Sequence, residues 1–208
     1  MSQEPLVNEL SIDERIEKFK SILEGNEYEE VIVQKYIVHG TPYIFKDDED
    51  KYFDLKREIA AHFSTYYSGI HYNNIHMVGS AKLGFSIAPS KLWKPFDFES
   101  DIDVVIVSSK LFEKIWEDIH QFNIDLTSRS QQEEKNYRRF LNYFFKGWIR
   151  PDLFPFEYSA KDNWFTFFEK ISYKKYGPQK ITGALYHSFN FFEKYHIENI
   201  NNIRTLKR

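Results

Sequence analysis

The chain has 208 residues, a formal net charge of -3 and no cysteine, which excludes a disulfide framework, a thiolate zinc site and a cysteine nucleophile. This length is typical of one domain, and an aromatic content of 18% predicts a core that is rich in rings. No apolar stretch reaches membrane-spanning length, and Met1–Leu10 is acidic and polar, unlike a secretory signal, so we expect a cytoplasmic protein without a membrane partner.

Charge is distributed unevenly along the chain. Residues 1–60 hold 15 acidic and 8 basic side chains, a net charge of -7, whereas residues 129–180 hold 11 basic and 6 acidic ones, a net charge of +5. A basic half indicates contact with a polyanion, although solvated surface charge is the commoner explanation for such a stretch.

The first part of the chain is predicted to be mainly helical. Ser11 and Glu14 form a capping box in front of a helix with regularly spaced apolar residues. The stretch Tyr28–His39 is compatible with either a helix or a strand. The acidic run Asp47–Asp50 precedes a helix over about Tyr52–Tyr67 and complements the positive end of its dipole.

A short apolar run, Ile75–Val78, predicts the first strand, and Gly79-Ser80 follows it directly. A Gly-Ser turn that leaves a strand exposes backbone N–H groups and a hydroxyl, which suits phosphate oxygens. A helix can begin in Ala81–Ile87, and Pro89–Glu99, with two prolines and several aromatic residues, indicates an inserted loop.

The run Asp101–Val107 predicts a second strand that carries two acids. Residues i and i+2 of a strand point to the same face, so the carboxylates of Asp101 and Asp103 project together, while Ile102 and Val104 line the opposite face. Two like charges so close together are unfavourable unless a cation lies between them, and the usual cation is a divalent metal. Metal-binding carboxylates and a phosphate-binding turn together indicate nucleotide chemistry.

The rest of the chain is predicted to be helical apart from one extended segment. The predicted elements are a helix after Ser108-Ser109, a helix from the capping box Ser130/Glu133 to Gly147, an extended segment Trp148–Phe156, and helices over Trp164–Tyr173 and about Ile181–Tyr195. Without repeats or a low-complexity linker, we expect a single domain over residues 1–208, with a core of about 50–156 and a helical C-terminal part of about 160–208.

The order strand, Gly-Ser, helix, loop, strand with Asp-x-Asp resembles the DNA polymerase beta-like nucleotidyltransferase superfamily, including poly(A) polymerases and cyclic-oligonucleotide synthases of cGAS-like type. The resemblance covers about Ile75–Val107 and at its widest reaches Phe156. It rests on Val78-Gly79-Ser80-Ala81-Lys82-Leu83-Gly84-Phe85 and Ser100-Asp101-Ile102-Asp103-Val104-Val105. Twenty residues separate Ser80 from Asp101, more than in the compact family motif, which implies an insertion at Ile87–Glu99.

The resemblance implies an α+β fold whose mixed sheet, of nucleotidyltransferase type, carries the acids between N-terminal and C-terminal helices. It also implies that Asp101 and Asp103 hold two Mg²⁺ (or Mn²⁺) ions on a nucleoside triphosphate. A third carboxylate from a later strand completes such a site and helps to activate the acceptor hydroxyl. Asp152, in the order Asp-Leu-Phe-Pro, is the best candidate, and Asp125 is the alternative; Pro151 is unusual in a central strand because it lacks a ladder donor.

Residues that would bind the nucleotide follow from the same resemblance. Gly79 and Ser80 are expected to hold the terminal phosphates. A basic side chain would offset the triphosphate charge, and a tyrosine could stack on the base. The candidates are Lys82, Lys174, Lys175 and Lys180 for the charge, and Tyr173 and Tyr176 for the base. For Lys174, Lys175 and the tyrosines, a solvated surface or core packing is the commoner role.

The implied function is a metal-dependent nucleotidyltransferase that moves a nucleoside monophosphate from a triphosphate such as ATP to an acceptor hydroxyl. RNA, mainly tRNA, is the favoured acceptor, with Arg138-Arg139 as its contact; a second nucleotide, a protein hydroxyl and a small molecule stay open. Small enzymes of this kind resemble those of toxin–antitoxin and phage-defence systems. The alternatives are a non-catalytic nucleotide-sensing or partner-binding relative and a signalling-nucleotide synthase. The position of Asp152 relative to Asp101 and Asp103 distinguishes turnover from mere binding.

Overall fold

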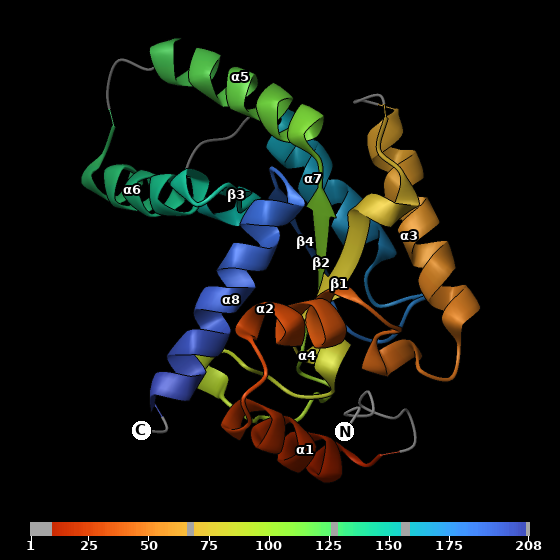
Figure 1. Cartoon of the computed structure of the whole chain (residues 1–208). Helices are drawn as coiled ribbons and strands as arrows, with labels where there is room; N and C mark the ends of the chain where they lie inside the picture. The colour runs from red at the N-terminus through yellow and green to blue at the C-terminus, as the bar shows by residue number, and fades with distance from the viewer. Residues whose placement is uncertain (1–9, 66–68, 126–128, 155–158, 207–208) are drawn as a thin grey trace.

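The computed structural model describes residues 10–65, 69–125, 129–154 and 159–206, without the side chains of 122–125 and 206. The elements in chain order are α1 (Ile12–Glu24), α2 (Glu29–Ile32), the π-helix η1 (Val33–Val38), η2 (Tyr43–Phe45), α3 (Glu49–Ser64), η3 (Tyr72–Asn74), β1 (Ile75–Val78), α4 (Gly79–Leu83), η4 (Pro89–Lys91), β2 (Ile102–Val107), α5 (Ser109–Asp125), α6 (Gln131–Phe145), β3 (Trp148–Ile149), η5 (Pro151–Leu153), α7 (Ser159–Ile171), β4 (Ile181–Tyr186) and α8 (Phe189–Leu206) (Figure 1).

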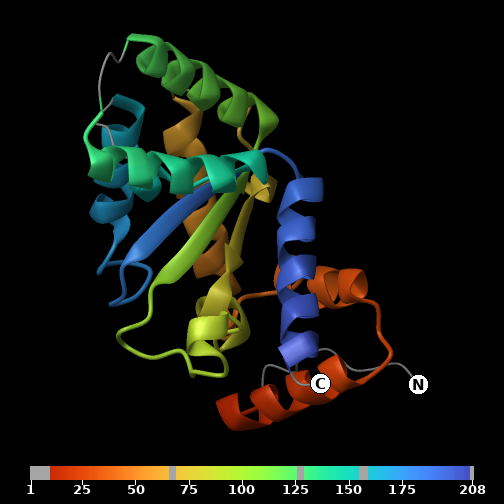
Figure 2. The ribbon, with the colours of Figure 1, turned by 90° about the vertical axis from the view of Figure 1, so that its left-hand side faces the viewer.

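The four strands form one mixed sheet in the order β1-β2-β4-β3. β1 pairs with β2 in antiparallel register, β4 lies parallel to β2, and β3 is antiparallel to β4. Helices lie on both sides of the sheet, as Figure 2 shows for α8 on one side and α7 on the other. The predicted α+β class with a mixed sheet is therefore confirmed.

Each face of the sheet carries its own core. Ile102, Val104 and Ile106 of β2 pack with residues of α3, α5 and α7, whereas Val105 and Val107 pack with residues of α1, η1 and α8. The alternation predicted from the sequence is thus present, but both faces of β2 are covered, as expected for a strand that has a parallel neighbour.

Capping chemistry explains where several helices begin. The Ser11/Glu14 and Ser130/Glu133 capping boxes are both formed, with hydrogen bonds in each direction. The Asp48 side chain accepts a hydrogen bond of 3.0 Å from the Lys51 N–H and begins α3 three residues before the predicted start. The stretch Tyr28–His39, left open between helix and strand, is helical as α2 and η1.

Two predictions for the second half of the chain were wrong. The predicted helix Ile181–Tyr195 is a strand over its first six residues, and helix α8 begins only at Phe189. Gly183 allows this strand to pack closely against α7, because a Cβ at position 183 would lie 2.2 Å from the Phe168 ring. Of the described residues in the predicted extended segment Trp148–Phe156, only Trp148–Ile149 form a strand, and Pro151–Leu153 forms a 3₁₀ turn; residues 155–156 lie outside the described part of the chain. Proline at 151 cannot donate to a strand ladder, which accounts for the early end of β3.

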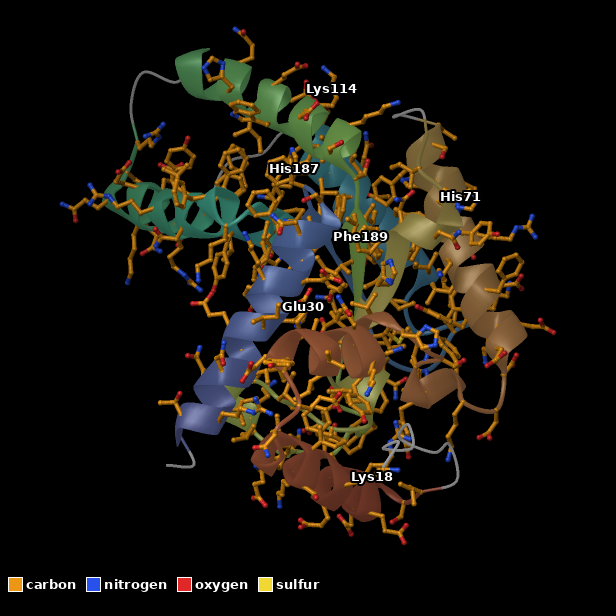
Figure 3. The ribbon with its side chains drawn as sticks, in the orientation of Figure 1. Lys18, Glu30, His71, Lys114, His187 and Phe189 are labelled. Carbon is orange, nitrogen blue, oxygen red and sulfur yellow. The ribbon has the colours of Figure 1, made fainter. Side chains whose placement is uncertain are left out.

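Aromatic rings join the helices to the sheet. Phe189 begins α8 beside the sheet, where its ring centroid lies 5.2 Å from that of His76 on β1 (Figure 3). His187 lies between β4 and α8, and its Nε2 is 3.5 Å from Oε1 of Glu113 on α5 (Figure 3).

Within the described residues, no helix combines the length and the apolar content that a membrane crossing requires.

Candidate functional site: paired aspartates beside a glycine turn

The Gly-Ser turn and the second aspartate meet because β1 and β2 are antiparallel. Val78, the last residue of β1, stands opposite Asp103 in the register, so Gly79 begins next to the aspartate. Gly79 has a φ of 68°, and a Cβ built on it would lie 2.9 Å from Asp103 Oδ2. Only a residue without a side chain allows the backbone to approach the carboxylate so closely. Two motifs that are 22 residues apart in the sequence thus form one site.

The two aspartates lie at the start of β2. Asp101 is exposed just before the strand, and Asp103 is half-buried on the face of the sheet that also carries Val105. Asp103 Oδ1 accepts a hydrogen bond of 2.7 Å from Thr182 Oγ1. Neither carboxylate forms an ion pair with any residue that the structure describes.

Burial is the main influence on the Asp103 carboxyl and raises its pKa above the ordinary value. The hydrogen bond from Thr182 lowers the pKa, and the neighbouring charge of Asp101 raises it. The cations Arg150 and Lys91 lower it as well, so both side chains lie within electrostatic reach of Asp103. Burial therefore disfavours the ionised form of the Asp103 carboxyl in the protein alone, and a bound cation would favour that form.

Thr182 is a site residue that sequence reasoning missed. It lies on β4, the parallel neighbour of β2, and is the direct register partner of Asp103. The segment was predicted to be helical, so its residues were not placed beside the acids. The signal was present in the run Ile181–Tyr186, which is apolar, follows Gly177-Pro178 and has the length of a buried strand.

Asp152, the predicted third carboxylate, is paired with an arginine. Its Oδ2 accepts a hydrogen bond of 2.7 Å from Arg150 Nη2, and its Oδ1 accepts one of 3.1 Å from Arg150 Nε. In the described part of the chain, no group of three or more His, Asp or Glu side chains is arranged to hold a metal ion. The structure therefore does not bring Asp152 into one cluster with Asp101 and Asp103. The alternative, Asp125, is the last residue of α5, and its side chain lies outside the described residues.

Lys82 contacts backbone carbonyl oxygens. Its Nζ donates to the backbone carbonyl oxygen of His39 at 2.6 Å and also to that of Gly40. Burial, together with the charges of Lys56 and Arg15, lowers the pKa of Lys82 to about 8. This buried ammonium ties α4 to the end of η1, whereas Lys91 and Arg150 are the cations near Asp103.

Most of the basic and aromatic candidates between α7 and β4 contact residues other than the paired aspartates. Lys174 Nζ donates to the Lys170 carbonyl at 2.9 Å, and Lys175 Nζ pairs with Asp54 at 2.8 Å. Tyr176 donates a hydrogen bond of 2.5 Å to Glu58. Tyr173 is exposed with a φ of 58°. The backbone carbonyl of Lys180 accepts a 2.8 Å hydrogen bond from the Ile102 N–H, which places Lys180 near the start of β2.

Arg138 and Arg139 lie on α6 and not on the elements that carry the aspartates. Both are exposed on α6, and Arg138 pairs with Glu134 at 3.0 Å. Helix α6 lies near the end of the sheet where β2 finishes, whereas Asp101 stands where β2 begins (Figures 1 and 2).

The donor set fits a divalent cation. Asp103 on β2 and Asp101 just before it supply two hard carboxylates, no described cation is ion-paired with either, and the Gly79 turn lies beside Asp103. Comparisons with protein-family models, with curated proteins and with solved structures find no match to this chain.

Proposed function

We propose that this chain is a nucleotidyltransferase, with a sheet of nucleotidyltransferase type, that binds a nucleoside triphosphate at Asp101, Asp103 and the Gly79-Ser80 turn. The single observation that carries the proposal is the packing of Gly79 against the Asp103 carboxylate, 2.9 Å from the place of a Cβ. A metal-binding carboxylate and a phosphate-binding turn are useful to each other only when one ligand contains both a cation and phosphates.

Asp101 and Asp103 would hold Mg²⁺ or Mn²⁺, which when bound neutralises phosphate charge and orients the triphosphate. The Ser80 hydroxyl is half-buried and forms no hydrogen bond with a described residue, so it can contact a phosphate oxygen. Lys91 and Arg150, rather than Lys82, would offset the remaining negative charge.

In the proposed reaction, an acceptor hydroxyl oxygen attacks the α-phosphorus and passes its proton to water, and pyrophosphate leaves with the electrons of the broken P–O bond. The new phosphodiester joins the nucleoside monophosphate to the acceptor. The net charge of +5 over residues 129–180 favours RNA, tRNA included, over a protein hydroxyl as the acceptor. A cytoplasmic role in defence or in a toxin–antitoxin pair rests on the resemblance alone.

A second candidate, a non-catalytic nucleotide-binding relative, is favoured by two observations. Thr182 stands beside Asp103, and Asp152 is engaged with Arg150 instead of joining the pair. Such a protein would still bind a metal–nucleotide complex but would not turn it over.

Transfer of label distinguishes the two candidates. The chain is incubated with each α-labelled ribonucleoside triphosphate, Mg²⁺ or Mn²⁺, and total RNA, alongside an Asp101→Ala/Asp103→Ala variant. An Asp118→Ala/Asp162→Ala variant is the matched control, because it removes two carboxylates from α5 and α7.

The proposal expects label in RNA for the wild type and the control, and none for the Asp101/Asp103 variant. Label in the protein or in a small product would redirect the acceptor to a hydroxyl of that kind, such as a second nucleotide in a signalling-nucleotide synthase. Nucleotide binding without any incorporation would support the non-catalytic candidate, and incorporation by the Asp101/Asp103 variant would overturn the site.

A further inference from the structure

The strand beside the paired aspartates offers a hydroxyl where a third carboxylate would be needed. β4 is the parallel neighbour of β2, and Thr182 is aligned with Asp103. A side chain at position 182 therefore lies next to the Asp103 carboxylate, as the hydrogen bond of 2.7 Å between them shows. The run Ile181–Tyr186 contains no acidic residue, so β4 adds no negative charge to the site.

The next strand adds a positive charge instead. Arg150 directly follows β3, and its guanidinium carbon lies 5.6 Å from the centre of the Trp148 ring. Trp148 packs with the core on the same side of the sheet as Asp103 and Val105. On this face the Thr182 hydroxyl lies next to Asp103, whereas β3 pairs with β4 at Leu185 and Tyr186. The remaining candidate acid, Asp152, is paired with the Arg150 guanidinium.

Two divalent cations in one site are held about 3.5–4 Å apart and repel one another strongly. Bridging and flanking carboxylates are the groups that offset this repulsion. Asp103 Oδ1 accepts a hydrogen bond from Thr182, and its Oδ2 lies 2.9 Å from the place of a Gly79 Cβ. Asp103 and the exposed Asp101 are the two anionic groups that can act as ligands. The site supplies two carboxylates, Asp101 and Asp103, and β4 supplies no third carboxylate that would hold a second cation against this repulsion.

We infer that Thr182 limits this site to one divalent cation per bound nucleotide. The inference rests on the proposed function, since it requires that the site binds a metal–nucleotide complex. It departs from the two ions that the resemblance implies, and it makes Thr182 the residue that determines how many cations the site holds.

The test counts bound Mn²⁺ rather than turnover. Equilibrium dialysis of the full chain against Mn²⁺ and an α,β-methylene nucleoside triphosphate gives the number of bound ions per bound nucleotide at saturation. We expect one ion for the wild type and two for Thr182→Asp, because the new carboxylate would face Asp103. Thr182→Asn is the matched control, since it has the shape of aspartate without the charge, and it is expected to stay at one.

Two ions bound by the wild type would overturn the inference while leaving the proposed function standing. No metal-dependent nucleotide binding by the wild type would overturn both. Thr182→Asp that binds nucleotide with one ion would show that position 182 does not set the count. Should Thr182→Asp fail to fold, the counts for the wild type and Thr182→Asn still decide, because two ions in either of them contradict the inference.

Discussion

Gly79 is the residue on which the geometry of the site depends most closely. Its φ of 68° is unfavourable for a residue with a side chain, and the space where a Cβ would stand is taken by Asp103 Oδ2. Gly40 has a similar φ of 76° but nothing within 4 Å of its Cβ position. The two glycines therefore separate the backbone penalty from the contact with the carboxylate.

We predict that Gly40→Ala lowers the free energy of unfolding by about 1 kcal/mol, the usual penalty of the left-handed conformation. Gly79→Ala should lower it by about 2–3 kcal/mol, because crowding adds to the same penalty. Urea unfolding measures both. In a protein that already carries Asp103→Gly, Gly79→Ala should lower the free energy of unfolding by only the backbone penalty of about 1 kcal/mol. Equal losses for Gly40→Ala and Gly79→Ala in the wild type would show that the contact is absent.

Asp103 carries a charge that the fold alone does not favour. Because burial raises its folded pKa above the unfolded value, the unfolded state gives up its proton first as the pH rises. Stability is therefore unaffected below the unfolded pKa and decreases as the pH rises through the folded pKa. Asp103→Asn, which keeps an oxygen for the Thr182 hydroxyl, should raise the Tm by a few degrees at pH 7 without metal.

The gain from Asp103→Asn should disappear at about pH 3, where the wild-type carboxyl is protonated in both states. Thermal unfolding at pH 3 and pH 7 measures it, with Asp162→Asn as an exposed control that is expected to raise the Tm at neither pH, because its carboxylate stands in the first turn of α7. A lower Tm for Asp103→Asn at pH 7 would mean that the charge stabilises the fold without a cation.

At the scale of elements, the sequence predicted those parts whose signals are local. Both capping boxes, strand Ile75–Val78 and the strand after Asp101 are where the patterns place them. β4 was missed because both faces of a central parallel strand are covered, so its pattern does not alternate. The contact between Thr182 and Asp103 could not be predicted without first recognising β4 as a strand. The orientation of Lys82 depends on the carbonyls of residues 39 and 40, a long-range contact with no sequence signal.

Helix α8 contains a buried imidazole that links stability to pH. His196 is buried, and neither ring nitrogen has a hydrogen-bond partner among the described residues. Burial lowers its pKa to about 4. Between pH 6.5 and pH 4 the unfolded state binds a proton that the folded state does not, so stability falls as the pH falls through this window.

We predict that His196 accounts for a loss of about 3 kcal/mol in the free energy of unfolding between pH 6.5 and pH 4, at 1.36 kcal/mol per pKa unit. His196→Leu should reduce the pH dependence by that amount. Urea unfolding at several pH values measures it, with the exposed His120→Leu on α5 as the control. An unchanged slope in His196→Leu would contradict the assignment to this residue.

At the scale of the whole molecule, the sheet brings together residues from distant parts of the chain. Gly79 and Asp103 come from the first half, whereas Arg150 and Thr182 come from the second, and the parallel pairing of β2 with β4 joins them. The α+β class was expected from the family resemblance, but the strand order β1-β2-β4-β3 depends on β4, which local patterns did not identify.

The central claim is that Asp101, Asp103 and the glycine turn bind a nucleoside triphosphate together with a divalent cation. Its most direct test is the Tm of the wild type with Mg²⁺ alone, with ATP or another nucleoside triphosphate alone, and with both, next to the Asp101→Asn/Asp103→Asn variant. A ligand that binds only the folded state at 100 times its Kd adds about 2.7 kcal/mol of stability. We predict an increase in Tm for metal and nucleotide together that exceeds the sum of the separate increases and is absent from the variant. Additive shifts, or an equal joint shift in the variant, would contradict a shared site at the paired aspartates.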